Sequence, residues 1–521
     1  MRYPPEARRG AEAALLAAAL AAAYLLVHPL TADHAAQEFR AELFAREGLQ
    51  SWSNLWFGGH HLPGYSVLSP PLGALIGPRL LGAIAAVASA VLFSAVAKRR
   101  WGEEARVGIL WFAAGTSISL FTGRITFALG VAVALAAVLF AQRGMRPAAI
   151  ACAAICPLAS PVAALFLACC GIAYSLAERS RAGIELAVAA AAVAGIVALA
   201  FPEGGSEPFV TSSFLPAILI AAVVFVALPR EERLVRFGVA TYAVALLGAY
   251  LIETPVGGNA TRLGALLLGP LLACALWPRN RLLLAMLAPV LVVWQATPVI
   301  RDLERAGDER AVSAAYYEPL LDHLDRAAGD RPIRVEVLPT ANHWEATYVP
   351  ERIGIARGWE RQLDRKLNPL FYDGALGAAE YRRWLELMAV SHVAVPDGSL
   401  DYAAEAEAAL IEGGLPYLSS GRAVEHWRVY RVREPAPLAS PPAELVALTA
   451  DGFVLEANRA GVSEVRIRHT PYWSVTGAAC VEESPDGFTR VSLERAGRVS
   501  VDASLAPWRA LAGGPTCGGG A

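Results

Sequence analysis

The stretch TADHAAQEFRAELFAREGLQSWSNLWFGGHHLPGYSVLSPPLGA, residues 31–74, separates two strongly apolar segments near the start of the chain. It is rich in charged, histidine and aromatic residues, whereas its neighbours consist mostly of Ala, Leu and Val. A polar segment between two membrane-crossing helices lies outside the hydrocarbon layer. The stretch therefore predicts a membrane protein whose first loop, residues 31–78, is unusually large.

The composition divides the chain into two parts. Of its 521 residues 55% are hydrophobic and 18% are charged, whereas soluble proteins carry about 25% charged residues. The deficit lies before residue 300, so residues 1–300 are predicted to form a polytopic transmembrane domain and the rest to be water-soluble. A net charge of −2 argues against a nucleic-acid partner, which favours a basic face.

Apolar runs predict the membrane spans, because a helix needs roughly 20 apolar residues to cross about 30 Å of hydrocarbon. The first run is longer than the core of a signal peptide and predicts a retained helix. The runs 147–157 and 160–177 fit either a hairpin or one interrupted span. We predict eleven spans: 11–30, 79–97, 107–121, 125–141, 147–157, 160–177, 183–201, 212–228, 235–252, 262–277 and 282–299.

Basic residues predict the orientation, since cytoplasmic loops carry an excess of Lys and Arg. Basic clusters occur in every second loop, provided that 147–177 is a hairpin. This pattern places the N-terminus in the cytoplasm of a bacterial-type plasma membrane, and it places residues 31–78 and the C-terminal part outside. The cytoplasmic clusters are 2–9, 98–106, 143–146, 179–181, 230–236 and 279–281.

The C-terminal part predicts two small domains. Residues 301–432 alternate helix and strand patterns, with strands predicted at 333–339, 391–396 and 426–432, which favours an α/β domain. A proline-rich linker, 433–444, leads to short strands over 445–510 that are typical of a β-sandwich, and 511–521 is predicted to be disordered. Cys480 and Cys517 form a disulfide only if this part is external, and the sequence leaves their pairing open.

The first loop contains Trp52, Trp56 and Tyr65, which we expect to anchor it at the membrane interface. It also contains most of the candidate chemistry. Asp33 follows the first span directly, where a carboxylate suits a general base or a ligand of a divalent cation such as Mg²⁺ or Mn²⁺. Asp33 equally suits the cap of the helix predicted after it. The two adjacent histidines suit a structural loop as well as a binding site. The polar side chains of the loop that are candidates for substrate binding, these two histidines included, are His34, Glu38, Arg40, His60 and His61.

Arginines at the outer ends of other spans are candidates for anion binding. Arg124 lies in a tight turn between two spans, and Arg262 follows a Gly-Gly-Asn turn at the start of a helix. Guanidinium groups bind phosphate in a bidentate way, and helix N-termini favour anions. Interfacial snorkelling is the alternative. Glu253 and Asn259 belong to the same outer end and are included as candidates.

An aromatic-rich segment of the soluble part, residues 340–374, has little regular periodicity. Irregular loops on a scaffold often bind ligands. Trp344 and Arg357 are therefore candidates for acceptor binding, with packing as the alternative.

This layout resembles the GT-C type of polytopic membrane glycosyltransferase. The resemblance rests on the acidic residue after the first span, on the pattern GLQSWSNLWFGGHHLPGYSVLSPP (residues 48–71) and on an external C-terminal region. The organisation is also similar to membrane proteins of the YfhO type and to those related to 6-pyruvoyl-tetrahydropterin synthase. No Asp-x-Asp or Glu-x-Asp signature accompanies Asp33.

The resemblance implies transfer of a sugar from a polyprenyl-phosphate donor to an external cell-envelope acceptor. Asp33 would act as base or metal ligand, and Arg124 and Arg262 would contact phosphate. A lipid or solute transporter and a non-catalytic scaffold that binds a partner or polymer are the rival hypotheses. Transporters often carry ionisable residues in mid-span, and these central spans do not.

Overall fold

The computed structural model describes residues 5–307, 310–504 and 517. It divides the chain into two compact units. The helical unit contains Met1–Gln37, Tyr65–Val197 and Gly204–Gly307. The sheet unit contains Glu38–Gly64, Ala198–Glu203 and Asp308–Ala521. The predicted first loop is thus shared: its ends belong to the helical unit and its middle to the sheet unit.

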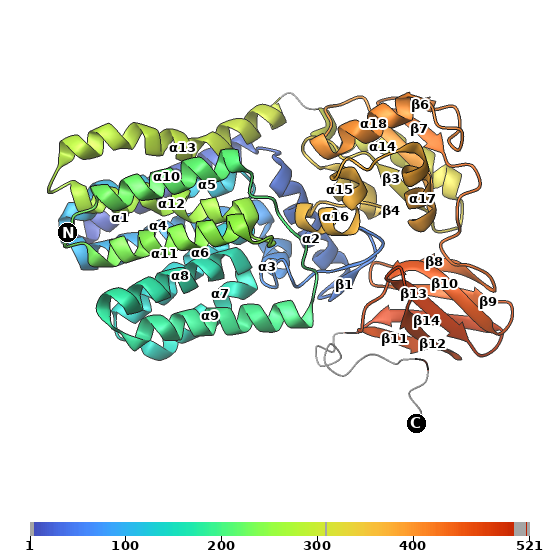
Figure 1. Ribbon diagram of the computed structural model, residues 1–521, viewed down its shortest axis with the longest axis horizontal. Coiled ribbons are helices and arrows are strands. Elements are labelled where there is room, and N and C mark those ends of the chain that lie inside the picture. Colours follow the sequence, from blue (N-terminus) through green and yellow to red (C-terminus); the bar gives the residue numbers. More distant parts are fainter. Residues whose placement is uncertain (1–4, 308–309, 505–516, 518–521) are drawn as a thin grey trace. The chain divides into compact units, whose positions relative to one another are not determined.

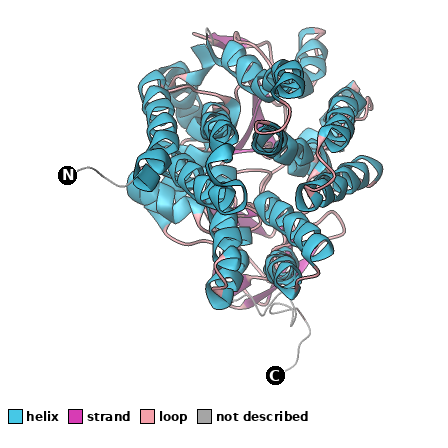
Figure 2. Cartoon of the chain, turned by 90° about the vertical axis from the view of Figure 1, so that its left-hand side faces the viewer, coloured by secondary structure: helices cyan, strands magenta, loops and turns pink. Residues whose placement is uncertain are grey.

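The helical unit is a bundle of apolar helices (Figure 1), which Figure 2 shows nearly end-on. Its buried core is rich in alanine, and small side chains allow membrane helices to approach closely. The helices are α1 (Pro5–Val27), the first turns of α2 (Ala32–Glu47), α3 (Ser69–Ile76), α4 (Pro78–Trp101), α5 (Arg106–Phe121), α6 (Ile125–Gln142), α7 (Arg146–Ala159), α8 (Pro161–Glu178), α9 (Arg181–Ala200), α10 (Thr211–Ala227), α11 (Arg233–Leu251), α12 (Thr261–Leu276) and α13 (Arg281–Gly307).

Each of the eleven predicted spans falls on a helix, but fewer helices have the length and composition of a crossing. Within the described residues seven helical stretches qualify, or eight if α1 and α2, bent by 83°, form one span. That count treats Pro78–Phe121 as one stretch of 44 residues, and α7 and α10 are too short to qualify. The structure thus has the apolar helices of a membrane protein.

The segment 147–177 forms two helices, α7 and α8, and not one. They meet at Ser160, whose hydroxyl accepts a hydrogen bond from the Ala163 backbone and caps α8. Pro161 at the first position of α8 cannot donate the hydrogen bond that would continue α7. The break is therefore encoded locally by the Ser-Pro pair.

The sheet unit contains a five-stranded mixed sheet of order β4-β3-β5-β7-β6. β3 runs parallel to its neighbours β4 and β5, and β7 runs antiparallel to the central strand β5. The patterns predicted as strands at 333–339, 391–396 and 426–432 correspond to β3, β5 and β7. The elements are β3 (Arg334–Val337), β4 (Gly354–Ile355), β5 (Val390–Pro396), β6 (Arg422–Val424), β7 (Trp427–Arg431), α14 (Ala314–Ala328), α15 (Glu345–Tyr348), α16 (Arg361–Leu367), α17 (Ala378–Leu387) and α18 (Tyr402–Glu412).

Two further sheets, of order β10-β13-β12 and β11-β14-β9-β8, share one hydrophobic core and form the expected β-sandwich. Cys480 on β12 is paired with Cys517 in a disulfide. The other residues of the predicted disordered tail, 511–516 and 518–521, lie outside the described residues. The strands are β8 (Ala443–Leu448), β9 (Gly452–Ala457), β10 (Gly461–Arg468), β11 (Trp473–Thr476), β12 (Ala479–Glu483), β13 (Phe488–Leu493) and β14 (Gly497–Ala503).

The middle of the first loop is part of the sheet-unit core. Trp52, on the short strand β1 (Trp52–Ser53), packs edge-on against Trp473 with ring centroids 5.7 Å apart. The indole of Trp56 donates to the Ala346 carbonyl at 2.9 Å. Both tryptophans are buried, so the expectation that they anchor the loop at the membrane surface is wrong.

Candidate functional site

Asp33 lies in the first turn of α2, inside the helix and not at the capping position that the sequence suggested. A negative charge there still interacts favourably with the helix dipole. The next residue, His34, is fully buried. Its Nε2 is 2.7 Å from the Tyr24 hydroxyl and its Nδ1 is 3.0 Å from the Thr31 hydroxyl. His34 therefore fixes the start of α2 against α1 and is not open to a substrate.

Arg124 reaches Asp33 because the α5–α6 turn packs closely on α2. Gly123 has a φ of +75°, and a Cβ built there would lie 2.5 Å from the His34 backbone nitrogen. Only glycine suits both the left-handed conformation and this approach. The next residue then places its Nε 3.5 Å from Asp33 Oδ2.

Arg262 comes to the same carboxylate from α12. The short 3-10 helix Gly257–Ala260 precedes it and packs against residue 207, since a Cβ on Gly257 would meet the Glu207 carbonyl. Arg262 Nη2 lies 3.9 Å from Asp33 Oδ2, and its guanidinium lies over the Phe127 ring. Three segments that are distant in sequence thus meet at one carboxylate.

The contacts between these three charges are loose. Both distances exceed that of a hydrogen bond, and the buried Nε of Arg124 has no hydrogen-bond partner in the described part of the chain. The side chains of Arg124, Arg262 and Asp33 are 17%, 19% and 29% exposed. Two partly accessible guanidinium groups share one carboxylate, so the cluster of Asp33, Arg124 and Arg262, the charge cluster, retains positive charge for an anion.

Asp302 is a further acidic residue of this region that the sequence analysis missed. It lies near the end of α13, forms an ion pair with Arg301 at 3.1 Å, and interacts electrostatically with Arg124 and Asp33. The predicted span ended at residue 299, and no motif marks the charges that follow it. Asp302 is far from Asp33 and Arg124 in sequence, and it comes near them only when α13 packs in the folded protein.

The charge cluster does not fit a divalent cation. The ion-pair partners of the Asp33 carboxylate are two guanidinium groups, which repel a metal ion, and Asp302 adds only one further carboxylate to this region. No group of three or more His, Cys, Asp or Glu side chains suited to a metal occurs in residues 5–307, 310–504 and 517. The expectation that Asp33 binds Mg²⁺ or Mn²⁺ is therefore not supported by the residues around it.

An apolar groove of about 470 Å³ lies on the surface of the helical unit. Only apolar side chains line it, among them Ala18, Ala22 and Leu25 of α1 and Ile84 of α4. Ala21 and Ala83 line it too, and they belong to the same buried cluster as Tyr24 and Ile125. The Tyr24 hydroxyl lies 2.7 Å from His34, the residue after Asp33, and Ile125 is the residue after Arg124. The buried cluster therefore connects side chains that line the groove with the residues next to the charge cluster.

Two candidates at the outer end of α12 lie apart from these contacts. Glu253 is exposed. Asn259 lies within the short helix Gly257–Ala260, where its backbone nitrogen donates to the Val256 carbonyl. The ion-pair partners of Asp33 are Arg124 and Arg262, and the binding roles of Glu253 and Asn259 stay predictions.

The remaining first-loop candidates belong to the sheet unit. Arg40 is buried, pairs with Glu360 and lies over the Trp56 ring. Burial raises the pKa of Glu360 to about 7, although Arg40 opposes this shift. Glu38 is half-buried. These contacts hold residues 38–47 of α2 against the α/β domain and require no ligand.

His60 and His61 form the short strand β2 (His60–His61), so their side chains point to opposite faces. His60 stacks on Trp56, and burial lowers its pKa to about 4, which keeps it neutral. His61 Nδ1 is 2.8 Å from Glu203, and its Nε2 is 3.1 Å from the Thr470 hydroxyl. Both side chains are buried in the sheet unit, so neither is accessible for the substrate binding that we expected of them.

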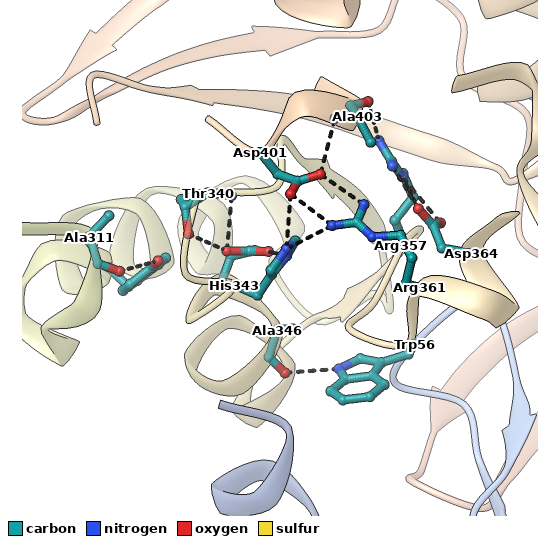
Figure 3. A network of polar contacts seen from close by, with 12 residues as sticks. Trp56, Ala311, Thr340, His343, Ala346, Arg357, Arg361, Asp364, Asp401 and Ala403 are labelled. Atoms are coloured by element: carbon teal, nitrogen blue, oxygen red, sulfur yellow. Dashed lines mark hydrogen bonds and ion pairs between the residues drawn. The ribbon is translucent and has the colours of Figure 1, made fainter. Parts of the chain in front are cut away.

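Arg357 belongs to a buried network at the carboxyl ends of the parallel strands (Figure 3). Its Nη2 donates to Asp364 at 2.6 Å and its Nη1 lies 3.4 Å from Glu407. Beside it, Arg361 makes a bidentate pair with Asp401 at 2.8 and 2.7 Å. Burial raises the pKa of Asp364, but Arg357 outweighs that effect and holds it below its usual value.

His343 and Trp344 complete this part of the sheet unit. Burial lowers the pKa of His343, yet hydrogen bonds to Asp401 and Glu345 outweigh burial and raise it above its ordinary value. Trp344 is buried and stacks on Tyr348. Arg357 and Arg361 are each paired with a carboxylate of the network, so the packing alternative describes Trp344 and Arg357 better than acceptor binding does. The buried carboxylate of Glu336, on β3, has no hydrogen-bond partner in the described part of the chain.

No known family model matches the sequence, and no curated protein does either.

Proposed function

We propose that the protein is a membrane-embedded glycosyltransferase of the GT-C type, which moves a sugar from a polyprenyl-phosphate donor to a cell-envelope acceptor. The observation that carries the proposal is the meeting of Asp33, Arg124 and Arg262, which come from three segments of the helical unit. Separate helix caps or snorkelling side chains would have no reason to converge. The same three residues were the candidates for base and phosphate contacts in the sequence.

Arg124 and Arg262 would bind the donor phosphate. Charge-assisted hydrogen bonds from guanidinium to phosphate are short and can be bidentate, whereas both contacts to Asp33 are long. An incoming phosphate would therefore compete well for the two arginines. As the sugar leaves, the same groups would stabilise the charge on the departing polyprenyl phosphate.

Asp33 would act as the general base. Once the arginines contact phosphate, its carboxylate is free to accept a hydrogen bond from the acceptor hydroxyl. The hydroxyl oxygen attacks the anomeric carbon, its proton passes to Asp33, and the bond from that carbon to the phosphate oxygen breaks. The products are the glycosylated acceptor and polyprenyl phosphate, and the sugar configuration inverts.

The apolar groove would hold part of the donor's lipid chain. Its lining is apolar throughout, and hydrocarbon binds such surfaces without loss of hydrogen bonds. We further propose the eleven-span arrangement in a bacterial-type plasma membrane, with the N-terminus in the cytoplasm and the charge cluster and sheet unit outside. The basic residues of the alternate loops support this orientation.

A transporter and a non-catalytic scaffold remain rival functions. A transporter that binds anionic lipid would use Arg124 and Arg262 but would have no need of Asp33 as a base. A scaffold would need none of the three. The role of Asp33 therefore separates the three functions.

The test is transfer by Asp33→Asn in proteoliposomes supplied with a panel of polyprenyl-phosphate sugars and cell-envelope acceptors. Loss of the base predicts a fall in transfer rate of about 10²–10⁴-fold, with donor binding retained. Glu104→Gln is the matched control, because Glu104 is an exposed carboxylate of the helical unit that belongs to none of the candidate sites. An Asp33→Asn protein that transfers sugar at the wild-type rate would overturn the proposal.

A further inference from the structure

The carboxyl ends of β3 and β5 form a topological switch point of the mixed sheet. β3 lies between β4 and β5 and runs parallel to both. The chain leaves β3 toward β4 on one side, and after β5 it continues through α18 to β6 and β7 on the other side. In open α/β sheets, ligands bind outside the carboxyl ends of strands whose connections leave in opposite directions. This end of the sheet is therefore a favourable position for a ligand.

Tyr402 presents an aromatic ring to solvent at this end. Its side chain is 59% exposed, and within the described residues of the sheet unit it is the only aromatic side chain that is exposed. The backbone around it is fixed, because the loops after β3 and β5 bond each other. The Ala341 nitrogen donates to the Ser399 carbonyl at 2.8 Å, and the Asp401 nitrogen donates to the Pro339 carbonyl at 2.9 Å. The exposed ring therefore has a rigid support.

Arg361 joins this ring to a second one. Its guanidinium carbon lies 4.7 Å from the centre of the Tyr402 ring and 5.9 Å from that of Tyr372. The two ring centroids are 6.3 Å apart. Arg361 already pairs with both oxygens of Asp401 (Figure 3), so its charge is neutralised. Arg361 thus supports the two rings and leaves the recognition of a charge to another residue.

Arg365 supplies that charge. It lies four residues after Arg361 on α16, so the two side chains share a helix face. Its guanidinium carbon lies 4.9 Å from the centre of the Tyr372 ring. Its buried Nε has no hydrogen-bond partner, and no carboxylate pairs with it, among the residues that the structure describes. Arg365 therefore retains a positive charge beside the two tyrosine rings.

We propose that Tyr402, Tyr372 and Arg365, the tyrosine-arginine surface, bind a saccharide that carries a carboxylate, such as a uronic acid. The C–H face of a sugar ring is apolar and packs on an aromatic ring, and a guanidinium binds a carboxylate through two parallel hydrogen bonds. A neutral saccharide would leave Arg365 unpaired, and a small anion would leave Tyr402 uncovered. The surface belongs to the sheet unit, and its role is independent of the proposed sugar transfer.

The test is titration of full-length protein in nanodiscs with a panel of uronic-acid oligosaccharides and their neutral counterparts. We expect the wild type to bind an acidic member at least about tenfold more tightly than its neutral counterpart. Arg365→Gln should remove this preference. Tyr402→Ala should raise Kd about tenfold, whereas Tyr402→Phe, which keeps the ring, should stay within about twofold. Arg422→Gln, at an exposed arginine of β6, is the control.

Three results would overturn the inference. They are a wild type that binds no acidic member of the panel, an Arg365→Gln protein that keeps the acidic preference, and equal losses in Tyr402→Ala and Tyr402→Phe. Because Tyr402 is exposed, both of its variants are expected to fold. The titration contains no lipid donor, so a protein that transfers no sugar still reports on this surface. Failure of the proposed function and failure of the inference are therefore distinguished.

Discussion

The charge cluster of the helical unit and the Arg357 network of the sheet unit are built from the same groups, yet they differ in how these groups meet. Arg357 donates to Asp364 at 2.6 Å and is almost completely buried, with a second carboxylate in contact. Arg124 and Arg262 approach Asp33 only to 3.5 and 3.9 Å and remain partly exposed. A buried, fully bonded pair stabilises a fold, whereas loosely paired and accessible arginines are suited to bind an anion.

The largest expected effect is loss of stability when the buried arginine is removed. Arg357→Leu leaves Asp364 and Glu407 without their cation, which typically costs about 3–5 kcal/mol. Melting of the purified protein in detergent should show a much lower transition temperature. Arg124→Gln is the matched variant in the charge cluster and is expected to melt near the wild type. Equal destabilisation by both variants would break the comparison.

A second prediction concerns the geometry of phosphate binding. Arg262→Lys keeps the charge but loses the bidentate fork. We expect donor affinity to fall about tenfold, in the range for one hydrogen bond to a charged group. Titration of polyprenyl phosphate into nanodiscs measures this affinity. Wild-type affinity in the lysine variant would mean that only net charge matters.

A smaller effect is expected from pH on the sheet unit. Burial raises the pKa of Glu360 from 4.5 to about 7, so between these values the folded protein holds a proton that the unfolded chain has lost. The contribution of Glu360 to the free energy of unfolding therefore falls as the pH rises from 4.5 to about 7. The melting temperature should drop by a few degrees over this window, and less in Glu360→Gln. Identical slopes would show that Glu360 does not titrate as its burial implies.

The sequence located the charge cluster because topology and residue type sufficed for it. The alternation of basic loops predicted that Asp33, Arg124 and Arg262 lie on the same side of the membrane. All three lie at the ends of spans, where side chains from different helices can come together. Strands such as β3 and β5 were also predicted, since short apolar patterns bounded by turn residues carry their own signal.

The middle of the first loop was misinterpreted for a physical reason. Tryptophan and histidine are typical of membrane interfaces, but they pack equally well inside a protein, and the partner of Trp56 lies at Ala346. A local pattern does not reveal a contact across 290 positions. Asp302 could not be predicted for a similar reason, because it comes near Arg124 only when α13 packs in the folded protein.

The most direct test of the central claim is the binding of polyprenyl phosphate to the double variant Arg124→Gln, Arg262→Gln in nanodiscs. The control is Arg352→Gln, an arginine of the sheet unit that contacts Asp322 and Asp325 and remains 39% exposed. If the charge cluster binds the phosphate, the double variant should lose about 100-fold or more in affinity, and the control should bind like the wild type. Equal binding by the wild type and the double variant would contradict the account.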